Sequence, residues 1–241
     1  VADTTICDGD VAGVFDAGAG FSSYAWSGNG TGTSQTTART TAGVYTVNVV
    51  DGNGCKDTTS ASLFINSKPN ISVADTTICD GDVAGVFNAG AGFTTYNWSG
   101  NGTGTSQTTA RTTAGVYTVR VVDANGCKDT TSATLTINAK PNISVADTTI
   151  CDGDVAGVFD VGAGFSSYAW SGNGTGTSQT TARTTAGVYT VRVVDANGCR
   201  DTTSATLTIN AKPNISVADT TICDGDVAGV FDAGAGFSSY A

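Results

Sequence analysis

Cysteine is the residue type in this sequence with the most evident chemistry. Seven cysteines stand alternately 48 and 24 residues apart in a chain of 241 residues that contains no His. Such spacing without His favours disulfides in an oxidising compartment over a metal site. The simplest pairing closes each 48-residue interval. It gives the bonds Cys7–Cys55, Cys79–Cys127 and Cys151–Cys199, and it leaves Cys223 to pair outside the sequence.

Catalysis is not predicted at these or other residues. The chain lacks His, and all 21 of its acidic residues are Asp. The usual general base and the commonest metal ligand are therefore missing. No Cys-x-x-Cys motif or neighbouring base is present to activate a thiolate. We predict that the sequence does not encode an enzyme, and we expect no catalytic or cofactor-binding residue.

One short acidic motif has ligands that suit calcium. Asp8 and Asp10 flank Gly9, and carboxylates on a glycine loop can bind Ca²⁺. No EF-hand or calcium-binding repeat pattern follows, and Asp in a surface turn is the more common explanation of such a motif. We therefore expect no metal or cofactor, with calcium at Asp8 and Asp10 as the alternative.

A repeat of 72 residues positions all of these side chains. The stretch VADTTICDGDVAGVF begins at Val1, Val73, Val145 and Val217, which gives three copies and a 25-residue remainder. The only prolines follow Lys68, Lys140 and Lys212 and indicate short, stiff joints. We expect domains at residues 1–68, 69–140 and 141–212, with a partial domain at 213–241. The sequence starts and stops inside the repeated unit, so we expect it to belong to a longer array.

Each copy is predicted to be all-β. The composition is rich in Gly, Thr, Val and Asn, and turn residues separate five or six short strands. In the first period we expect strands at 11–17, 22–26, 43–50 and 55–66, a polar edge segment at 33–40, and a leading strand equivalent to 71–78. An Asn-Gly turn at 51–54 joins the strand at 43–50 to the strand at 55–66.

Alternation along these strands predicts the core. The substitutions between copies at positions 16, 25, 48, 62 and 64 fall on the side of the strands that should face solvent. Trp26, Trp98 and Trp170 should be core residues rather than sugar-stacking platforms. The expected core of the first copy is Phe15, Tyr24, Trp26, Val44 or Tyr45, Val47, Val49, Leu63 and Ile65.

Three motifs in each copy carry a family resemblance. They are Tyr24-Ala25-Trp26-Ser27, Ala42-Gly43-Val44-Tyr45-Thr46-Val47 and Asp51-Gly52-Asn53-Gly54-Cys55. The chain resembles the immunoglobulin-like and PKD-like repeats of giant Bacteroidota cell-surface adhesins, including gliding-motility adhesins. It lacks the Trp-Asp-Phe-Gly-Asp-Gly segment of PKD domains, which favours the immunoglobulin-like type. The resemblance implies a tandem array of small immunoglobulin-like β-sandwiches that is secreted to the cell surface and forms a stalk, filament or adhesin.

This topology raises an alternative for the disulfides. In an immunoglobulin-like fold, Cys7 and Cys55 would lie at opposite ends of a sandwich, about 20 Å apart for strands of about six residues. That separation exceeds what a disulfide allows. If the bottom of one domain meets the top of the next, Cys7 could instead reach Cys127, and Cys79 could reach Cys199. Free or inter-chain cysteines are the third possibility.

The motif Asp-Thr-Thr occurs seven times and resembles the O-glycosylation site of Bacteroidota, which is Asp, then Ser or Thr, then an apolar residue or Thr. Ordinary Thr on an exposed strand is the other explanation. The candidate residues are Thr4, Thr58, Thr76, Thr130, Thr148, Thr202 and Thr220.

Charge and pattern limit the partners. The net charge of −10 opposes binding to nucleic acid or to an anionic membrane surface, and no apolar run is long enough to insert into a membrane. We expect contacts between neighbouring repeats and self-association into fibres. The expected function is the structural repeat region of an extracellular filament or adhesin stalk. The alternatives are a carbohydrate-binding or calcium-dependent adhesive module, and an accessory array of a secreted enzyme.

Overall fold

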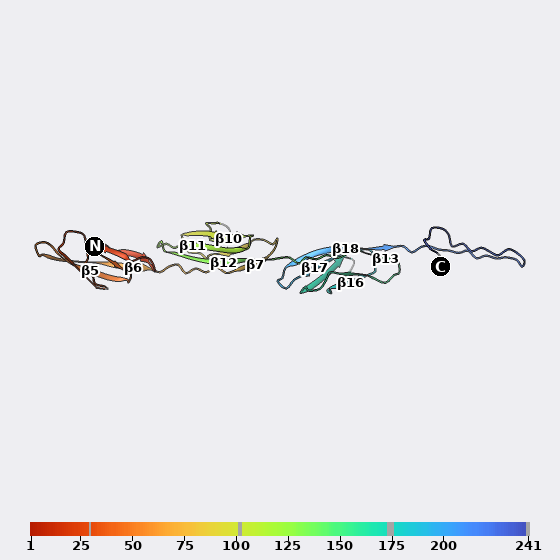
Figure 1. Ribbon diagram of the computed structural model, residues 1–241, viewed down its shortest axis with the longest axis horizontal. Coiled ribbons are helices and arrows are strands. Elements are labelled where there is room, and N and C mark those ends of the chain that lie inside the picture. Colours follow the sequence, from red (N-terminus) through yellow and green to blue (C-terminus); the bar gives the residue numbers. More distant parts are fainter. Residues whose placement is uncertain (29, 101–102, 173–175, 240–241) are drawn as a thin grey trace. The chain divides into compact units, whose positions relative to one another are not determined.

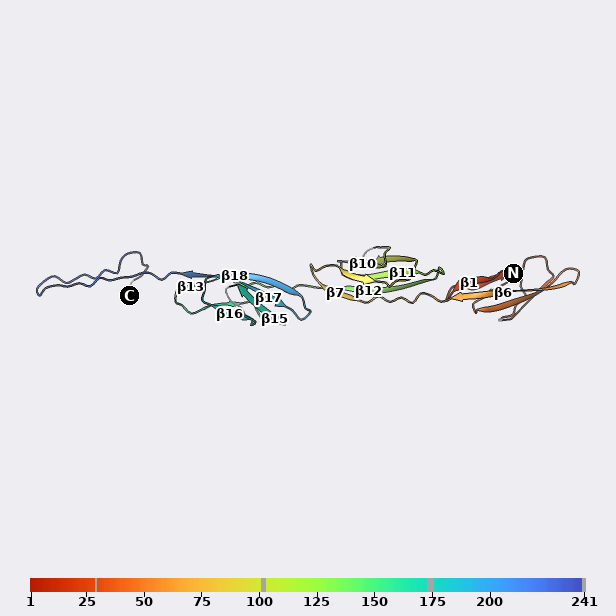
Figure 2. The same cartoon turned by 180° about the vertical axis from the view of Figure 1, so that it is seen from behind.

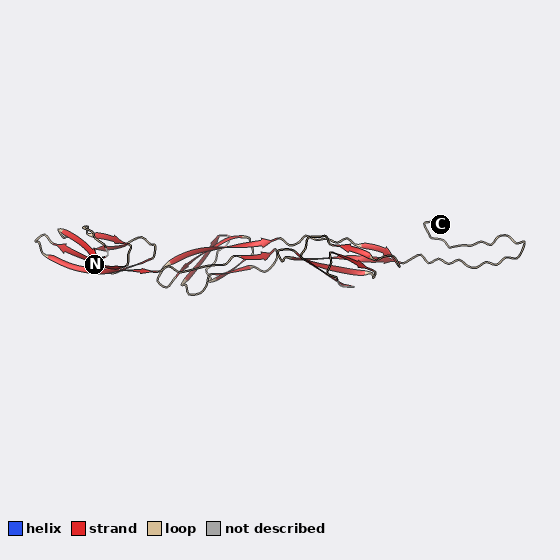
Figure 3. Ribbon diagram, turned by 90° about the horizontal axis from the view of Figure 1, so that it is seen from below, coloured by secondary structure: helices blue, strands red, loops and turns tan. Residues whose placement is uncertain are grey.

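A computed structural model of the chain describes residues 1–28, 30–100, 103–172 and 176–239. These residues form two compact units, Val1–Ile137 and Asn138–Ala241. The first unit holds the first two copies of the repeat, and the second holds the third copy and the partial one. The secondary structure of the described residues is β-strand without helix (Figure 3).

Six strands make up the first copy. They are β1 (Thr4–Cys7), β2 (Gly13–Asp16), β3 (Ser23–Gly28), β4 (Thr36–Arg39), β5 (Gly43–Val50) and β6 (Lys56–Asn66). One sheet has the order β1-β6-β5-β3, and β2 pairs with β4 in a second, two-stranded sheet. Side chains from both sheets share one apolar core, so each copy is a small β-sandwich.

The second and third copies repeat this topology (Figure 1). The second consists of β7 (Thr76–Cys79), β8 (Gly85–Asn88), β9 (Thr95–Gly100), β10 (Thr108–Arg111), β11 (Gly115–Val122) and β12 (Lys128–Asn138). The third consists of β13 (Thr148–Cys151), β14 (Gly157–Asp160), β15 (Ser167–Gly172), β16 (Thr180–Arg183), β17 (Gly187–Val194) and β18 (Arg200–Asn210). The predicted fold class, a tandem array of immunoglobulin-like β-sandwiches with a 72-residue period, is confirmed.

The first and last strands of the first and third copies run parallel. In the first copy, β1 pairs with the second half of β6, from Thr4 opposite Leu63 to Cys7 opposite Asn66. Figure 2 shows β1 beside β6. Just before β1, the Asp3 carboxylate accepts a hydrogen bond from the Ser62 backbone N–H at 2.7 Å. Because both strands point the same way, the chain enters each sandwich at one end and leaves it at the other.

Aromatic rings form the centre of the core. Phe15 on β2 lies 5.4 Å from Tyr45 on β5 and 6.2 Å from Trp26 on β3, measured between ring centroids. All three side chains are almost fully buried, and Trp98 and Trp170 are buried in the same way. The prediction that the tryptophans are core residues is therefore confirmed. Their indole N–H groups are satisfied internally, as in the 2.8 Å bond from Trp26 Nε1 to the Ser34 carbonyl.

The predicted core is correct in most positions. Between Val44 and Tyr45, the structure buries Tyr45 and leaves Val44 54% exposed. Tyr24 and Ile65 pack at the edge of the core and are half-buried, whereas Ala61 is a core residue that the sequence analysis missed. The substituted positions Asp16, Ala25, Asn48 and Phe64 are exposed as predicted, and only Ser62 is half-buried.

The leading strand is shorter than predicted. Residues 71–78 were expected to form it, but in the second copy β7 begins only at Thr76. Ile71 is still buried against the core of that copy, which means that the segment before β7 packs through side chains without a backbone ladder. Pro69, which has no N–H to donate, is also buried there.

The last segment of the chain differs from its counterparts. Residues 213–239 form no strand, although their sequence repeats the start of each copy. Phe231 is 68% exposed, whereas the equivalent Phe87 is 1% exposed. Ile215 is 62% exposed, whereas Ile71 is 9% exposed. This segment has no counterpart of β4, β5 and β6 to pair with, so its apolar side chains lie outside a sandwich.

Candidate functional site

The first two copies are joined covalently. Cys7 at the end of β1 forms a disulfide with Cys127, which directly precedes β12, over a sequence separation of 120 residues. Their Cα atoms are 5.5 Å apart, within the usual range for this bond. The bond therefore connects the exit end of one sandwich to the entry end of the next.

A tight turn places Cys127. It connects β11 to β12, and the Asp123 carboxylate accepts hydrogen bonds from the backbone N–H groups of Asn125 at 2.9 Å and Cys127 at 2.8 Å. The Asp123 N–H donates to the Cys127 carbonyl at 2.9 Å. Gly126 has φ +80°, a conformation that favours glycine. The predicted Asn-Gly turn thus fixes the backbone of the cysteine.

A second turn places Cys7. The Asp10 carboxylate accepts a hydrogen bond from the Cys7 N–H at 3.2 Å, and the Asp10 N–H donates to the Cys7 carbonyl at 3.0 Å. The Asp8 N–H donates to the Asn66 carbonyl at 2.8 Å, which holds this turn against the end of β6. The same Asn66 oxygen lies 4.0 Å from the Cys127 sulfur. Three chain segments therefore meet at the joint.

The prediction that cysteines pair within each copy is wrong. Cys127 is bonded to Cys7, and the exposed free cysteines are Cys55, Cys151 and Cys223. The physical reason is the direction of β1. Cys7 lies at the end of β6 that carries Asn66, whereas Cys55 precedes the first residue of that 11-residue strand, about 36 Å away.

The structure has the alternative pairing instead, with Cys7 bonded to Cys127. Cys79 and Cys199, which stand one period after this pair, are also disulfide-bonded.

The calcium candidates Asp8 and Asp10 belong to the turn that follows β1. One carboxylate oxygen of Asp10 already accepts the Cys7 N–H, and a Cβ at Gly9 would lie 3.2 Å from the Lys68 ammonium nitrogen. Among the described residues, no group of three or more Cys or Asp side chains has an arrangement that could hold a metal ion. The geometry is that of a hydrogen-bonded turn with a cation beside it, and calcium binding there stays a hypothesis.

The glycosylation candidates fall into two structural groups. Thr58, Thr130 and Thr202 are exposed near the start of the last strand of each copy. Thr4, Thr76 and Thr148 begin the first strand and are half-buried, and Thr220 is exposed in the last segment. The Asp of each motif in the three copies has a structural role that the sequence analysis missed. Asp57 Oδ1, for example, accepts the Thr58 N–H at 2.8 Å.

Two carboxyl groups at the end of the second strand have perturbed acidity. A hydrogen bond from Gln35 Nε2 at 2.9 Å, and then one from the Gly18 N–H at 2.8 Å, lower the pKa of Asp16 below its ordinary value of 3.8. Gln179 and the Gly162 N–H lower the pKa of Asp160 in the same way. The second copy has Asn88 at this place, which accepts the same two hydrogen bonds.

A cation stacked on the core was also missed. The Arg39 guanidinium lies 5.2 Å from the centroid of the Tyr45 ring, and Arg111 and Arg183 repeat the contact at 5.1 Å. The Arg39 Nη2 also donates to the Thr31 carbonyl at 3.1 Å. The recurrence of one arginine at the same place in every copy was the signal available in the sequence. Its contacts indicate that it holds the segment around Thr31 against the sandwich.

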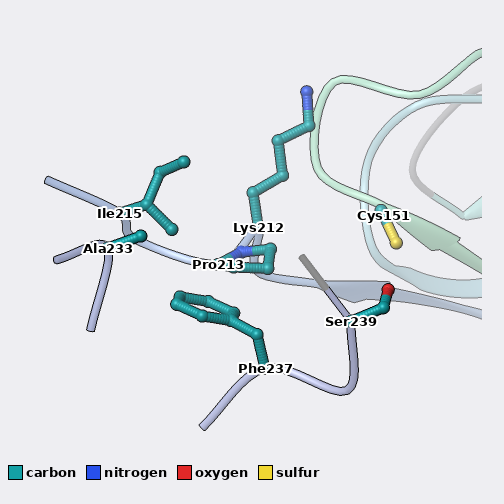
Figure 4. A pocket seen from close by; sticks show the side chains of 7 residues that line it. All are labelled: Cys151, Lys212, Pro213, Ile215, Ala233, Phe237 and Ser239. Atoms are coloured by element: carbon teal, nitrogen blue, oxygen red, sulfur yellow. The ribbon is translucent and has the colours of Figure 1, made fainter. Parts of the chain in front are cut away.

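An open cavity of about 690 Å³ lies in the second unit (Figure 4). Its lining residues are Cys151, Lys212, Pro213, Ile215, Ala233, Phe237 and Ser239. Ile215 and Ala233 are counterparts of Ile71 and Ala89, which are buried in the core of the second copy. The apolar wall is therefore the unburied core face of the partial copy, and it has no preformed set of polar groups that would define a ligand.

No family model and no curated protein matches the chain. Solved structures of similar architecture were found. A three-domain immunoglobulin fragment of titin is 14% identical, with a TM-score of 0.43 over 87% of this chain and 96% of that one. A 1.5-MDa bacterial ice-binding adhesin is 17% identical, with a TM-score of 0.39 over 86% of this chain and 94% of that one. A Ca²⁺-stabilised adhesin of an Antarctic bacterium is 18% identical, with a TM-score of 0.36 over 88% and 73%.

These TM-scores are below 0.5, so the fold assignment rests on the strand order and pairing described above. The described residues include no helix that could cross a membrane.

Proposed function

We propose that this chain is a structural repeat region of an extracellular bacterial filament or adhesin stalk. The observation that carries the proposal is the disulfide between Cys7 and Cys127. It joins the end of the first copy at which the chain leaves to the end of the second copy at which the chain enters. A bond placed there restricts bending and twisting between neighbouring copies. Such a joint serves a protein whose task is to span a distance.

The arrangement of each sandwich supports the same proposal. Because the first and last strands are parallel, the first copy connects end to end with the second through residues 67–75, the first of the short segments between copies. The burial of Pro69 and Ile71 at the first of these segments favours a packed joint over a flexible linker. The large aromatic side chains Trp26 and Tyr45 are committed to the core, which leaves them unable to stack on a sugar.

We also propose an extracellular location, because the chain contains disulfides. Disulfides persist in oxidising compartments, and four cysteines of this chain are disulfide-bonded. The resemblance to Bacteroidota surface adhesins leads to the same location. Thr58, Thr130 and Thr202 are the exposed candidate sites for O-linked glycans within the folded copies, and glycans there would shield the sheets from pairing with other chains.

The test is electron microscopy of native source material, with averaging along any fibre. The expected result is a continuous filament with an axial repeat of roughly 35–40 Å, the length of one sandwich with strands near the fibre axis. The cross-section would show whether chains associate laterally. Globular particles on a short, flexible tether would contradict the proposal, because the chain would then be a spacer beside a binding or enzymatic domain.

A further inference from the structure

We propose that the inter-copy disulfide directs tension past the sandwich cores, so that an oxidised array cannot lengthen by unfolding. The inference rests on the proposed function for its setting, because a stalk is a place where tension acts. It concerns the covalent path that tension takes through the joint at Cys7 and Cys127.

The path follows from where the bond lies. Cys7 is the last residue of β1, and Cys127 is followed directly by β12. Tension between the start of β1 and the end of β12 can therefore pass along residues 1–7, across the disulfide, and along residues 127–138. Both segments are largely extended strand already, and β12 alone spans 11 residues, or about 36 Å. Little further length is available from them.

Everything between the two cysteines lies outside this path. Residues 8–126 form a closed covalent loop that includes β2 to β6 of the first copy and β7 to β11 of the second. Unfolding that loop would not increase the distance between the ends of the path. Without the bond, tension would pass through the backbone alone. Unfolding would then release the chain between the two cysteines, whose sequence separation of 120 residues corresponds to about 430 Å at about 3.6 Å per residue.

The joint also shields the bond. Cys127 is fully buried and Cys7 is half-buried, although Cys55, at the place of Cys127 in the first copy, is exposed. A thiolate must reach a sulfur atom to exchange the disulfide, and burial restricts that approach. The bond should therefore persist while the joint stays closed.

The near identity of the copies extends the inference along the chain. Cys79 and Cys199, which stand one period after Cys7 and Cys127, are also disulfide-bonded. With every cysteine of a longer array bonded in this register, the segments equivalent to 127–151, which each cross one joint, carry the tension. The segments equivalent to 80–126, which hold the remainder of each sandwich, then lie outside it.

The test is single-molecule force spectroscopy of the full chain. One handle is attached at the N-terminus and one at position 140, through groups other than thiols. The oxidised chain is expected to show no large gain in contour length, whereas the fully reduced chain should gain about 430 Å. An equal gain in both states would overturn the inference.

Two variants sharpen this experiment. The double variant Cys7→Ser/Cys127→Ser should gain the full length without reductant, whereas Cys55→Ser, which alters a free cysteine of the first copy, should behave as the oxidised parent. If the double variant fails to fold, graded reduction of the parent gives the same comparison. A gain in oxidised Cys55→Ser equal to that of the reduced parent would contradict the proposed path.

The outcome is separable from that of the proposed function. A native filament whose oxidised copies lengthen by unfolding would overturn this inference and support the stalk. An oxidised chain that does not lengthen, found in source material without filaments, would support this inference and overturn the stalk.

Discussion

Cys7 lies directly opposite Asn66 across the parallel pair of strands β1 and β6. This pairing places Cys7 at the end of the sandwich where the chain leaves it, because both residues are the last of their strands. Cys55 is then an entire strand away, and the turn between β11 and β12 of the next copy presents Cys127 instead. The covalent link between copies is thus a consequence of strand direction.

Loss of this link should destabilise the first two copies. For a loop of about this length, the chain-entropy model gives a cost of about 4–5 kcal/mol for Cys7→Ser/Cys127→Ser. Chemical denaturation of the oxidised proteins, followed by intrinsic fluorescence, measures the change. Cys55→Ser is the matched control and should leave the midpoint unchanged. Equal midpoints for the double variant and the parent would contradict the prediction.

Gly13 should be sensitive to a single added methyl group. A Cβ at this position would lie 2.6 Å from Leu63 Cδ1 and 3.2 Å from Thr4 Cγ2, which is too close for a packed core. We expect Gly13→Ala to reduce the free energy of unfolding by about 1–3 kcal/mol. Gly52→Ala is the control, because a Cβ there meets nothing within 4 Å and the second copy has Ala124 at that place.

Phe87 should contribute far more to stability than an exposed phenylalanine. It is buried between Trp98 and Tyr117, so Phe87→Ala should cost about 3–5 kcal/mol through lost burial and a cavity. Phe64→Thr should be close to neutral, since Phe64 is exposed and the other copies have Thr at its place. Thermal unfolding of both variants gives the comparison. Similar shifts in melting temperature would refute the assigned core.

Acid should weaken the hydrogen bonds that Asp16 and Asp160 accept in the first and third copies. The equivalent bonds in the second copy are accepted by Asn88, which does not titrate. The pKa values of Asp16 and Asp160 are lowered on folding, so their contribution is present above the unfolded pKa of about 3.9 and is lost as the pH falls through the lowered folded pKa. Carboxyl NMR titration should place both below 3.8. In Asn88→Asp a third carboxyl should titrate likewise, and values at or above 3.8 would be inconsistent with the hydrogen bonds from glutamine.

Removal of divalent cations should leave the fold unchanged. The Asp10 carboxylate is engaged by the Cys7 N–H, and Lys68 lies beside Gly9, so the turn already has its own electrostatic partners. A strong chelator should not alter the melting temperature of the oxidised chain. A marked decrease that is reversed by added calcium would instead establish the site at Asp8 and Asp10.

The sequence determines the strands well where alternation is strong. Residues 45–49 alternate between apolar and polar side chains, and β5 (Gly43–Val50) has the predicted bounds. The core assignment stayed open where two apolar residues are adjacent, because only the pleat decides whether Val44 or Tyr45 points inward. Ile71 was assigned to a strand, but it packs without a ladder because residues 69–75 contact the sheet mainly through side chains.

The candidate site was harder to predict than the fold. Cysteine spacing alone could not distinguish Cys55 from Cys127 as the partner of Cys7, because the choice depends on the end of the sandwich at which each residue lies. The hydrogen bonds of Asp10 and Asp123 that position the two cysteines were likewise beyond sequence reasoning, since both residues look like ordinary turn aspartates.

The joint takes one cysteine from each of two neighbours, and this has a consequence for inheritance. Every copy carries both kinds of cysteine, one after its first strand and one before its last. Unequal recombination between the nearly identical coding repeats adds or removes whole periods, and each new neighbour then offers the matching thiol. Lineages can therefore lengthen or shorten the protein without redesigning a single contact.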